Sequence, residues 1–411
     1  MPAMEAQVDA PTRRLSAVMR EGERVMPLEL FFDLVFVLAL TQCTALMVDN
    51  PTWEGLGQGL LVLVLLWWTW AGYAWLTSVV DPEEGLVRIA LVAAMAALLI
   101  AALAVPESFT DRALEFAIAY GVVRVAHIAL FMLASRDDAG LRRSVAGLSI
   151  STTVGIALLV GGALVGGTGQ AVMWIVAAVL DLGEPYFFGA EGWRLVPAHF
   201  AERHGLIIIV ALGESIVALG VGSDVGLSAA VIAGAVLGVV LVFELWWIYF
   251  DIVAIANARR LVRLAPGREQ NDLARDAYSY LHFLLVAGIV LAALGLHDVL
   301  AHPHEHLKTV PAFALLGGIA IYLLGHVAVR LRGAHTLNRH RLILALVLLA
   351  LVPLAVEVSG LASLAAVAGL LAAMIAYETR SYGEGRIQVR HEYAVAGPTA
   401  ELLPDDRPSE R

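Results

Sequence analysis

The chain has 411 residues, of which 59% are hydrophobic and only 16% are charged. Soluble proteins carry about a quarter charged residues, so this composition and a mean hydropathy of +0.78 exclude an ordinary soluble domain. The single cysteine, Cys43, excludes an internal disulfide framework and a cysteine-based zinc or redox motif. The net charge of −10 lies largely in tails and loops and identifies no partner. We therefore expect a polytopic membrane protein.

Apolar runs between polar or Gly/Pro breaks predict an all-α transmembrane bundle with about twelve spans, each of roughly 20 residues. Residues 1–26 are expected to form a cytoplasmic N-terminal tail, and residues 381–411 a polar, disordered cytoplasmic C-terminal tail. The predicted spans are 27–48, 55–80, 85–105, 111–134, 144–165, 168–189, 198–222, 227–256, 272–297, 310–331, 339–357 and 360–379.

The distribution of basic residues predicts the orientation. If the N-terminus is cytoplasmic, almost all of the 27 lysine and arginine residues fall in segments on that same side of the membrane. Arg112 and Lys308 fall on the opposite side, and Arg124 lies within a span. Because basic loops stay in the cytoplasm, we expect both termini there and a multi-pass protein of the bacterial inner (plasma) membrane.

Short segment matches predict two parallel repeats of six helices, residues 27–190 and 191–380. LVFVLALTQ (34–42) can be laid on LIIIVALGE (206–214), and the Trp-Trp pair 67–68 on the pair 246–247. VAHIAL (125–130) similarly matches LGHVAV (324–329), which pairs His127 with His326. The three matches follow the same order along the chain. Chance matching of short apolar strings is the alternative.

The segment 197–222 is unusual because an apolar stretch of membrane-crossing length also carries ionisable residues. At 100° per residue, Arg203 and Glu214 fall within about 20° of each other on one helical face. Charged groups are expensive inside a bilayer unless they are paired or functional. Glycines 205, 213, 220 and 222 are expected to allow close helix approach. The tryptophans within spans are interpreted as packing residues first and as pore or substrate lining second.

The expected depth of each residue in the membrane and the helical period identify further ionisable residues that face the bundle. The candidates for ion relay or transport are Glu29, Asp33, Arg124, His127, Asp181, Glu184, Glu202, Arg203, Glu214, Glu244, Asp251, His282 and His326. Glu29 and Asp33 share one face, Glu244 and Asp251 another, and Tyr120, Arg124 and His127 a third. We expect these faces to look into the bundle and to form one cytoplasm-facing cluster.

Arg124 needs a carboxylate partner because a buried guanidinium keeps its charge. Asp33, Asp181 and Glu214 are the candidates. A permanent structural pair and a functional role are both compatible with this arginine. Carboxylates close to histidines are the components of a proton relay or a cation path, whereas each histidine taken singly fits a packing role equally well.

Other chemistries find no support in the sequence. Walker A, dinucleotide-binding and nucleophile-elbow patterns are absent, so neither an enzyme nor a nucleic-acid-binding protein is expected. The histidine-rich segment 297–308 matches no specific zinc template. We expect no catalytic residues, no cofactor and no metal site. The expected partners are the lipid bilayer and a small ion or solute (H⁺, K⁺ or another cation), and a homo-oligomer is compatible with the sequence.

PLELFFDLVFVLALTQ (27–42) and HFAERHGLIIIVALGESI (199–216) resemble the paired signature segments of the bacterial low temperature requirement A family. Together with YSYLHFLLVAGIVLAALG (278–295), the resemblance extends over about residues 24–380. It implies a polytopic bacterial membrane protein connected with growth in the cold, and implies little about biochemical activity.

A more distant likeness is to endosomal potassium channels built from two six-helix repeats, which carry a Phe-Ser-Asp motif in the first helix of each repeat. Phe31-Phe32-Asp33 is similar but lacks the serine, and residues 202–205 read Glu-Arg-His-Gly where the second motif would stand. This departure weighs against the pore geometry and potassium selectivity of those channels.

The sequence therefore predicts an ion channel or a proton- or ion-coupled transporter of small solutes. The transport site is expected between the two halves, lined by Asp33, Arg124, Asp181 and Glu214. The alternative is a non-transporting membrane scaffold or cold-stress factor in which the buried charges only fix helix packing.

Overall fold

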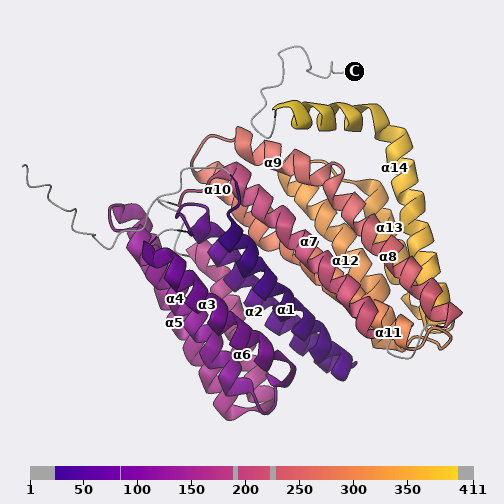
Figure 1. The fold of residues 1–411 in the computed structure, drawn as a ribbon, viewed down its shortest axis with the longest axis horizontal. Helices are drawn as coiled ribbons and strands as arrows, with labels where there is room; N and C mark the ends of the chain where they lie inside the picture. The colour runs from indigo at the N-terminus through magenta and orange to yellow at the C-terminus, as the bar shows by residue number, and fades with distance from the viewer. Residues whose placement is uncertain (1–23, 84, 188–192, 223–227, 397–411) are drawn as a thin grey trace, which may run out of the picture.

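A computed structural model describes residues 24–83, 85–187, 193–222 and 228–396, and within these ranges the chain is helical with short connections (Figure 1). The first half contains α1 (Pro27–Asp49), α2 (Trp53–Thr77), α3 (Gly85–Ala104), α4 (Ala113–Ala134), α5 (Ala139–Val165) and α6 (Gly167–Phe187). The second half contains α7 (Pro197–Gly222), α8 (Ala229–Phe250), α9 (Val253–Arg263), α10 (Arg268–Leu273), a π-helix (Ala274–Tyr280), α11 (Leu281–Ala301), α12 (Thr309–Ala334), α13 (Arg339–Ala355) and α14 (Gly360–Ala396).

Ten helical segments of the described chain are long and apolar enough to cross a membrane. They correspond to ten of the predicted spans, so the prediction of an all-helical, multi-pass membrane protein is confirmed. The remaining two predicted spans correspond to α6 and α13. α6 carries Asp181 and Glu184 in its last turns, and α13 has 17 residues, so these two helices fall outside that set.

The structure departs from the predicted boundaries in three places. The eighth span ends at Phe250, and the chain turns at Asp251 into the separate helix α9. The ninth begins earlier than predicted, because α10 and the π-helix run directly into α11. α14 extends beyond the predicted end of the twelfth span, through a kink at Tyr382 to Ala396, so residues 381–396 of the expected C-terminal tail are helical in the structure. Residues 397–411 and 1–23 lie outside the described part.

The helices of the two halves form neighbouring groups that meet along α1, α2, α7 and α11 (Figure 1). α1 packs directly against α7, and α11 packs against both of them. The N-terminal ends of α1 and α7 lie side by side, since His199 reaches Glu29. The last part of α14 crosses the same end of the bundle, which is uppermost in Figure 1. We refer to it as the upper end.

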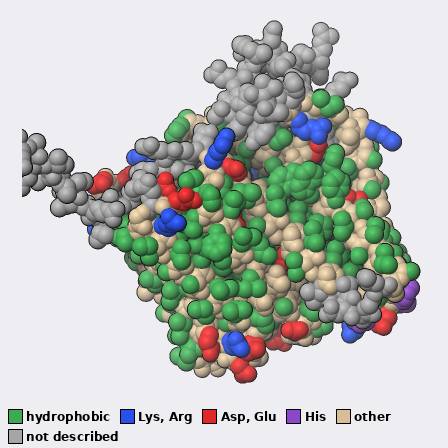
Figure 2. All heavy atoms as spheres, in the orientation of Figure 1, with side chains coloured by type: hydrophobic (Ala, Val, Ile, Leu, Met, Phe, Trp, Pro, Cys, Tyr) green, Lys and Arg blue, Asp and Glu red, His purple; other side chains and the backbone are tan. Residues whose placement is uncertain are grey.

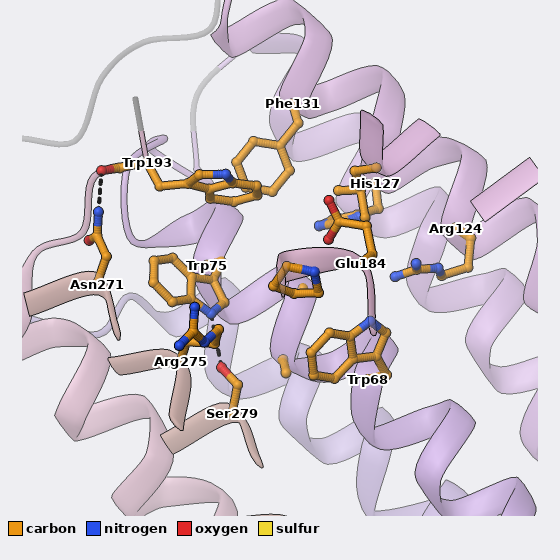
Figure 3. Close-up of a pocket in the computed structure, with 14 residues that line it drawn as sticks. Trp68, Trp75, Arg124, His127, Phe131, Glu184, Trp193, Asn271, Arg275 and Ser279 are labelled. Carbon is orange, nitrogen blue, oxygen red and sulfur yellow. Dashed lines mark hydrogen bonds between the residues drawn. The ribbon is translucent and has the colours of Figure 1, made fainter. Parts of the chain in front are cut away.

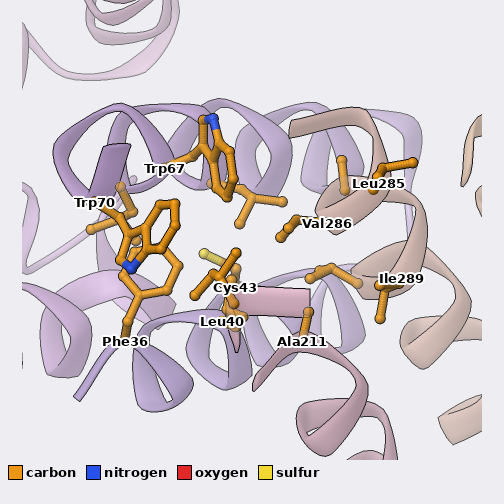
Figure 4. Close-up of a cluster of buried hydrophobic side chains, with 14 of the residues drawn as sticks. Phe36, Leu40, Cys43, Trp67, Trp70, Ala211, Leu285, Val286 and Ile289 are labelled. Carbon is orange, nitrogen blue, oxygen red and sulfur yellow. The ribbon is translucent and has the colours of Figure 1, made fainter. Parts of the chain in front are cut away.

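The centre of the bundle is an apolar core where these four helices meet (Figure 4). Phe36 and Cys43 of α1, Trp70 of α2, Ala211 of α7 and Ile289 of α11 are almost completely buried in it. Since this core joins helices from both halves, it couples the two groups of helices into one unit.

The closest helix contact is between α11 and α12. A Cβ atom at Gly288 would lie 2.7 Å from the Gly318 carbonyl oxygen, and one at Gly318 would lie 2.7 Å from the Ala292 nitrogen. Small residues allow such close backbone approach in membrane helices. The prediction that the glycines of span seven serve this purpose is wrong for residues 205, 213 and 220, because added Cβ atoms there would meet at most an ordinary contact.

The outer face shown in Figure 2 is hydrophobic across its middle and charged at its upper and lower rims. Large apolar side chains are exposed on several helices, among them Ile118, Val122 and Val125 of α4 and Val236 and Phe243 of α8. A hydrophobic belt between charged rims is the surface that a bilayer covers.

Candidate functional site

The start of α1 and the start of α7 are joined by a buried group of four ionisable side chains. Arg203 donates from Nη1 to Glu29 Oε1 (3.1 Å) and from Nη2 to Asp33 Oδ1 (2.8 Å). His199 donates from Nε2 to Glu29 Oε1 (2.9 Å). All four side chains are at most 2% exposed. The helical period explains the arrangement, since Glu29 and Asp33 on α1, and His199 and Arg203 on α7, are each one turn apart.

Neighbouring groups add further hydrogen bonds to this cluster. Trp70 Nε1 donates to Asp33 Oδ1 (2.8 Å), and its ring lies 5.6 Å from the Arg203 guanidinium carbon. Glu29 Oε2 accepts from the backbone nitrogen of Met26 (2.8 Å), which caps the start of α1. Two carboxylates thus share one arginine and one histidine, and this paired arrangement fixes α1 against α7.

A second buried group joins α4, α5 and α6. Arg124 Nη2 lies 3.3 Å from Asp181 Oδ2 and donates to Thr152 Oγ1 (2.9 Å). Tyr120 donates from its hydroxyl to Asp181 Oδ2 (3.2 Å). Among the three carboxylates predicted as partners of Arg124, the structure therefore selects Asp181. Tyr120 and Arg124 are one turn apart on α4, which is the predicted shared face.

Beside Arg124 lies a cavity of about 80 Å³, bounded by both halves of the chain (Figure 3). A water molecule needs roughly 10–15 Å³ on such a measure, so the cavity has room for several waters or a small solute. The first half contributes Trp68, Ala71, Gly72 and Trp75 of α2, Arg124, His127 and Phe131 of α4, Leu148 of α5, and Glu184 and Pro185 of α6. Trp193, Asn271, Arg275 and Ser279 complete the wall.

Two ionisable side chains in the cavity wall, Glu184 and His127, make no hydrogen bond or ion pair within the part of the chain that the structure describes. Glu184 is 4% exposed and makes no hydrogen bond or ion pair with any residue that the structure describes. The ring of His127 lies against Gly72, where an added Cβ would stand 2.9 Å from Nε2. Neither ring nitrogen has a partner in hydrogen-bond geometry within the described residues. The Glu184 carboxyl group is therefore available to a ligand in the cavity, whereas the His127 ring nitrogens are buried against Gly72.

The π-helix supplies the second-half side of this wall. Trp75 Nε1 donates to Ser279 Oγ (2.9 Å), and Trp67 Nε1 donates to the Ser279 carbonyl oxygen (2.7 Å). Arg275 bonds to Asp276 (2.7 Å) and lies 4.3 Å from the Tyr186 ring centroid. π-Helical turns occur frequently at functional sites, and this one joins α2 and α6 to the second half.

A third group consists of aromatic and histidine side chains around α8, α11 and α12. Tyr249 OH lies 2.9 Å from His282 Nε2, while His282 Nδ1 donates to the Ala277 carbonyl oxygen (2.7 Å). The His204 ring contacts the His282 ring at 5.4 Å between centroids, and His326 packs on Tyr249 at 6.0 Å. This chain of rings runs from α7 to α12.

Glu214 lies separately from all three groups. It is 1% exposed, and neither carboxyl oxygen has a hydrogen-bond partner among the described residues. Cys43 and Thr44 of α1 are its polar neighbours, and the Thr44 hydroxyl donates to the Leu40 carbonyl oxygen of its own helix (3.4 Å). Arg203 and Glu214 both face α1, as expected from their common helical face.

The remaining candidates lie at other places. Glu202 is exposed and accepts from the Val25 backbone nitrogen (3.3 Å). Asp251 accepts from Arg390 Nη1 of the last part of α14 (2.8 Å). Glu244 is buried on α8 and has one carboxyl oxygen without a partner in the described structure. The expected single cluster is therefore divided into several groups, and the predicted wall of Asp33, Arg124, Asp181 and Glu214 is not brought together by direct contacts.

Sequence reasoning did not single out the buried ion pair between α13 and α14. Arg341 donates from Nε to Glu378 Oε1 (2.9 Å) and from Nη2 to Oε2 (2.8 Å). Both residues lie inside predicted spans, at ends that meet when consecutive spans run antiparallel. Their positions and opposite charges could therefore have predicted this pair from the sequence. The four cavity residues after the first half, from Trp193 to Ser279, carried no comparable signal in the sequence.

The apolar helices, the hydrophobic belt and the buried ionisable groups define a multi-pass α-helical membrane protein. The family model described as bacterial low temperature requirement A protein (LtrA) matches residues 24–376. The chain belongs to this LtrA family, as the signature segments indicated. An uncharacterized protein of Rhizobium meliloti (strain 1021) is 32% identical over 315 residues, which cover 72% of this chain and 75% of that protein. No solved structure matches the chain.

Proposed function

We propose that this protein is an ion channel or a proton- or ion-coupled transporter of small solutes in the bacterial inner membrane. The observation that carries the proposal is that Glu184 and Glu214 are buried carboxyl groups without hydrogen-bond or ion-pair partners among the described residues, inside a bundle of membrane-crossing helices. A buried charge without a partner is costly in such a place, and ionisable residues there commonly mark ion or substrate paths. The cavity beside Glu184 gives a solute a place to bind.

The order of helix contacts supports the proposal of two parallel repeats. In the first half, α1 packs on α2 and α3, α3 on α4, α4 on α5, and α5 on α6. In the second half, α7 packs on α8 and α11, α11 on α12, α12 on α13, and α13 on α14. α2 also contacts α6 as α8 contacts α14. The cavity wall comes from both halves, where transporters built from repeats bind their substrates.

The proposed orientation places the upper end of the bundle in the cytoplasm. α9 ends there with Arg259, Arg260 and Arg263, and the start of α13 adds Arg339 and Arg341. The basic residues of short loops favour the cytoplasmic side. With this orientation the cluster of Glu29, Asp33, His199 and Arg203 and the cavity both lie in the cytoplasmic half.

Flux measurements test the proposal. The full chain is reconstituted in lipid vesicles, and the movement of H⁺, K⁺ and Na⁺ is followed with ion-selective dyes. We expect flux with the unaltered protein and a loss of at least about tenfold with Glu214→Gln, since an amide cannot take up and release a proton or balance a cation. Glu202→Gln, on the same helix but exposed, is the matched control and should leave the flux unchanged.

Absence of H⁺, K⁺ and Na⁺ flux with the unaltered protein would contradict the proposal, and unchanged flux in Glu214→Gln would remove that residue from the path. The second candidate function, a non-transporting scaffold, is favoured by a different observation. Arg203 with Glu29 and Asp33, Arg124 with Asp181, and Arg341 with Glu378 each join neighbouring helices. Such pairs fix helix packing without moving any ion.

A further inference from the structure

The arginines that line the cavity are already paired with carboxylates other than Glu184. Arg124 is bonded to Asp181 and to Thr152, so its guanidinium is already neutralised. Arg275 is bonded to Asp272 (3.0 Å) and to Asp276, and Asp276 also accepts from Arg332 (2.8 Å). Asp272 also pairs with Arg268 (3.7 Å), so Asp181, Asp272 and Asp276 each have an arginine partner.

Glu184 is the carboxylate that this network leaves out. Its charge lies within electrostatic range of Arg124, but no ion pair or hydrogen bond joins the two in the described structure. Figure 3 shows the Glu184 carboxyl group turned away from Arg124, toward the side of the cavity where Phe131 and Trp193 lie. A bound cation at this position would give the Glu184 carboxylate an ionic partner.

The wall opposite Glu184 is aromatic. The Trp75 and Trp193 rings meet edge to face at 5.7 Å between centroids, and the Phe131 and Trp193 rings meet in the same way at 5.1 Å. Trp68 lines the lower side of the cavity in Figure 3. Tryptophan rings bind cations through their faces, and cages of such rings recognise substituted ammonium groups.

The same wall disfavours the two other classes of charged ligand. A metal cation such as K⁺ requires several oxygen ligands, whereas most of the lining residues are apolar or aromatic. An anion would need a free arginine, whereas Arg124 and Arg275 are both paired and Glu184 would repel it. The volume of about 80 Å³ admits a cation of a few non-hydrogen atoms.

We propose that this cavity binds a small organic ammonium ion, with Glu184 as the counter-ion and Trp75, Trp193 and Phe131 as the aromatic wall. The inference rests on the proposed function, because it names the class of solute that the proposed transporter would bind. It concerns binding alone, so it can be tested without a transport assay.

Equilibrium binding to the purified full chain in detergent tests the inference. Tetramethylammonium chloride is titrated by isothermal calorimetry, and sodium chloride, potassium chloride and sodium acetate are titrated at the same ionic strength. We expect saturable binding of tetramethylammonium alone. Glu184→Gln and Trp193→Leu should each raise its Kd about tenfold or more. Glu184 makes no hydrogen bond or ion pair with a described residue, so the glutamine variant should keep the fold, which thermal unfolding verifies.

Two control variants match these changes elsewhere in the molecule. Glu202→Gln removes an exposed carboxylate, and Trp53→Leu removes a tryptophan that is 56% exposed and does not line the cavity. Both should bind tetramethylammonium as the unaltered protein does. Absence of saturable binding, equal binding of potassium or acetate, or an unchanged Kd in Glu184→Gln would each overturn the inference.

The result of the binding experiment can be distinguished from the result of the flux experiment that tests the proposed function. Ion flux without ammonium binding would leave transport standing and remove this solute class. Ammonium binding that depends on Glu184, without flux of ions or of the ammonium ion in vesicles, would establish the site and remove the transport function.

Discussion

At the scale of single residues, the buried ionisable groups fall into paired and unpaired sets. Arg203 is held by Glu29 and Asp33, and Arg124 by Asp181. Glu184 and Glu214 lack such partners within the described chain. Removing one member of a buried pair leaves an uncompensated charge, whereas replacing both members by apolar residues is often nearly neutral. Stability and transport should therefore respond differently when the same pair is altered.

The Arg124–Asp181 pair allows this distinction to be tested. Arg124→Met alone should lower the free energy of unfolding by about 3–5 kcal/mol, because Asp181 stays buried without its partner. Arg124→Met combined with Asp181→Leu should recover most of that loss. We nevertheless expect solute flux of the double variant to stay low, because the cavity loses the arginine that borders Glu184. Thermal unfolding in detergent and flux in vesicles measure the two effects.

A double variant with the flux of the unaltered protein would favour the scaffold interpretation for this pair. Arg341→Met with Glu378→Leu is the matched control, because that pair is also buried and does not line the cavity. It should show the same recovery of stability and no change of flux.

At the scale of helices, the sequence predicted most of the fold because hydropathy and helical period are local properties. Predicted spans such as 27–48 and 310–331 agree with α1 and α12 to within a few residues. Side-chain pairing across helices depends on tertiary packing, so the choice of Asp181 among the partners of Arg124 needed the structure. The π-helix and the turn at Asp251 have no local sequence pattern, and the second-half wall of the cavity was missed for that reason.

The contact between α11 and α12 leads to a prediction at this scale. Gly288→Ala would place a methyl group 2.7 Å from backbone atoms of α12, so the two helices must separate. We expect a clear fall in thermal stability, on the order of the 1–3 kcal/mol that overpacking costs. Gly369→Ala is the control, because no atom lies within 4 Å of its added Cβ. Alanine has the higher helix propensity, so that variant should be at least as stable as the parent protein.

At the scale of the whole molecule, the arrangement of the chain ends constrains the topology. The starts of α1 and α7 meet at the upper end, and the last part of α14 reaches it as well, where Arg390 pairs with Asp251. Lys308 lies in the loop between α11 and α12. α11 runs away from the upper end and α12 returns to it, so this loop lies at the opposite end of the bundle. The structure gives the arrangement of the helices, whereas the orientation of this arrangement in the membrane is inferred from the basic residues.

Cysteine labelling in cells tests that orientation. The native Cys43 is completely buried, so it should not react and need not be removed. Lys308→Cys and Arg263→Cys place single exposed thiols at opposite ends of the bundle. If the upper end is cytoplasmic, a membrane-impermeant maleimide should label Lys308→Cys in spheroplasts and Arg263→Cys only after permeabilisation, because basic loops stay inside. The reverse pattern would show that the upper end faces outward, and the cavity with Glu184 would then lie in the outer half of the membrane.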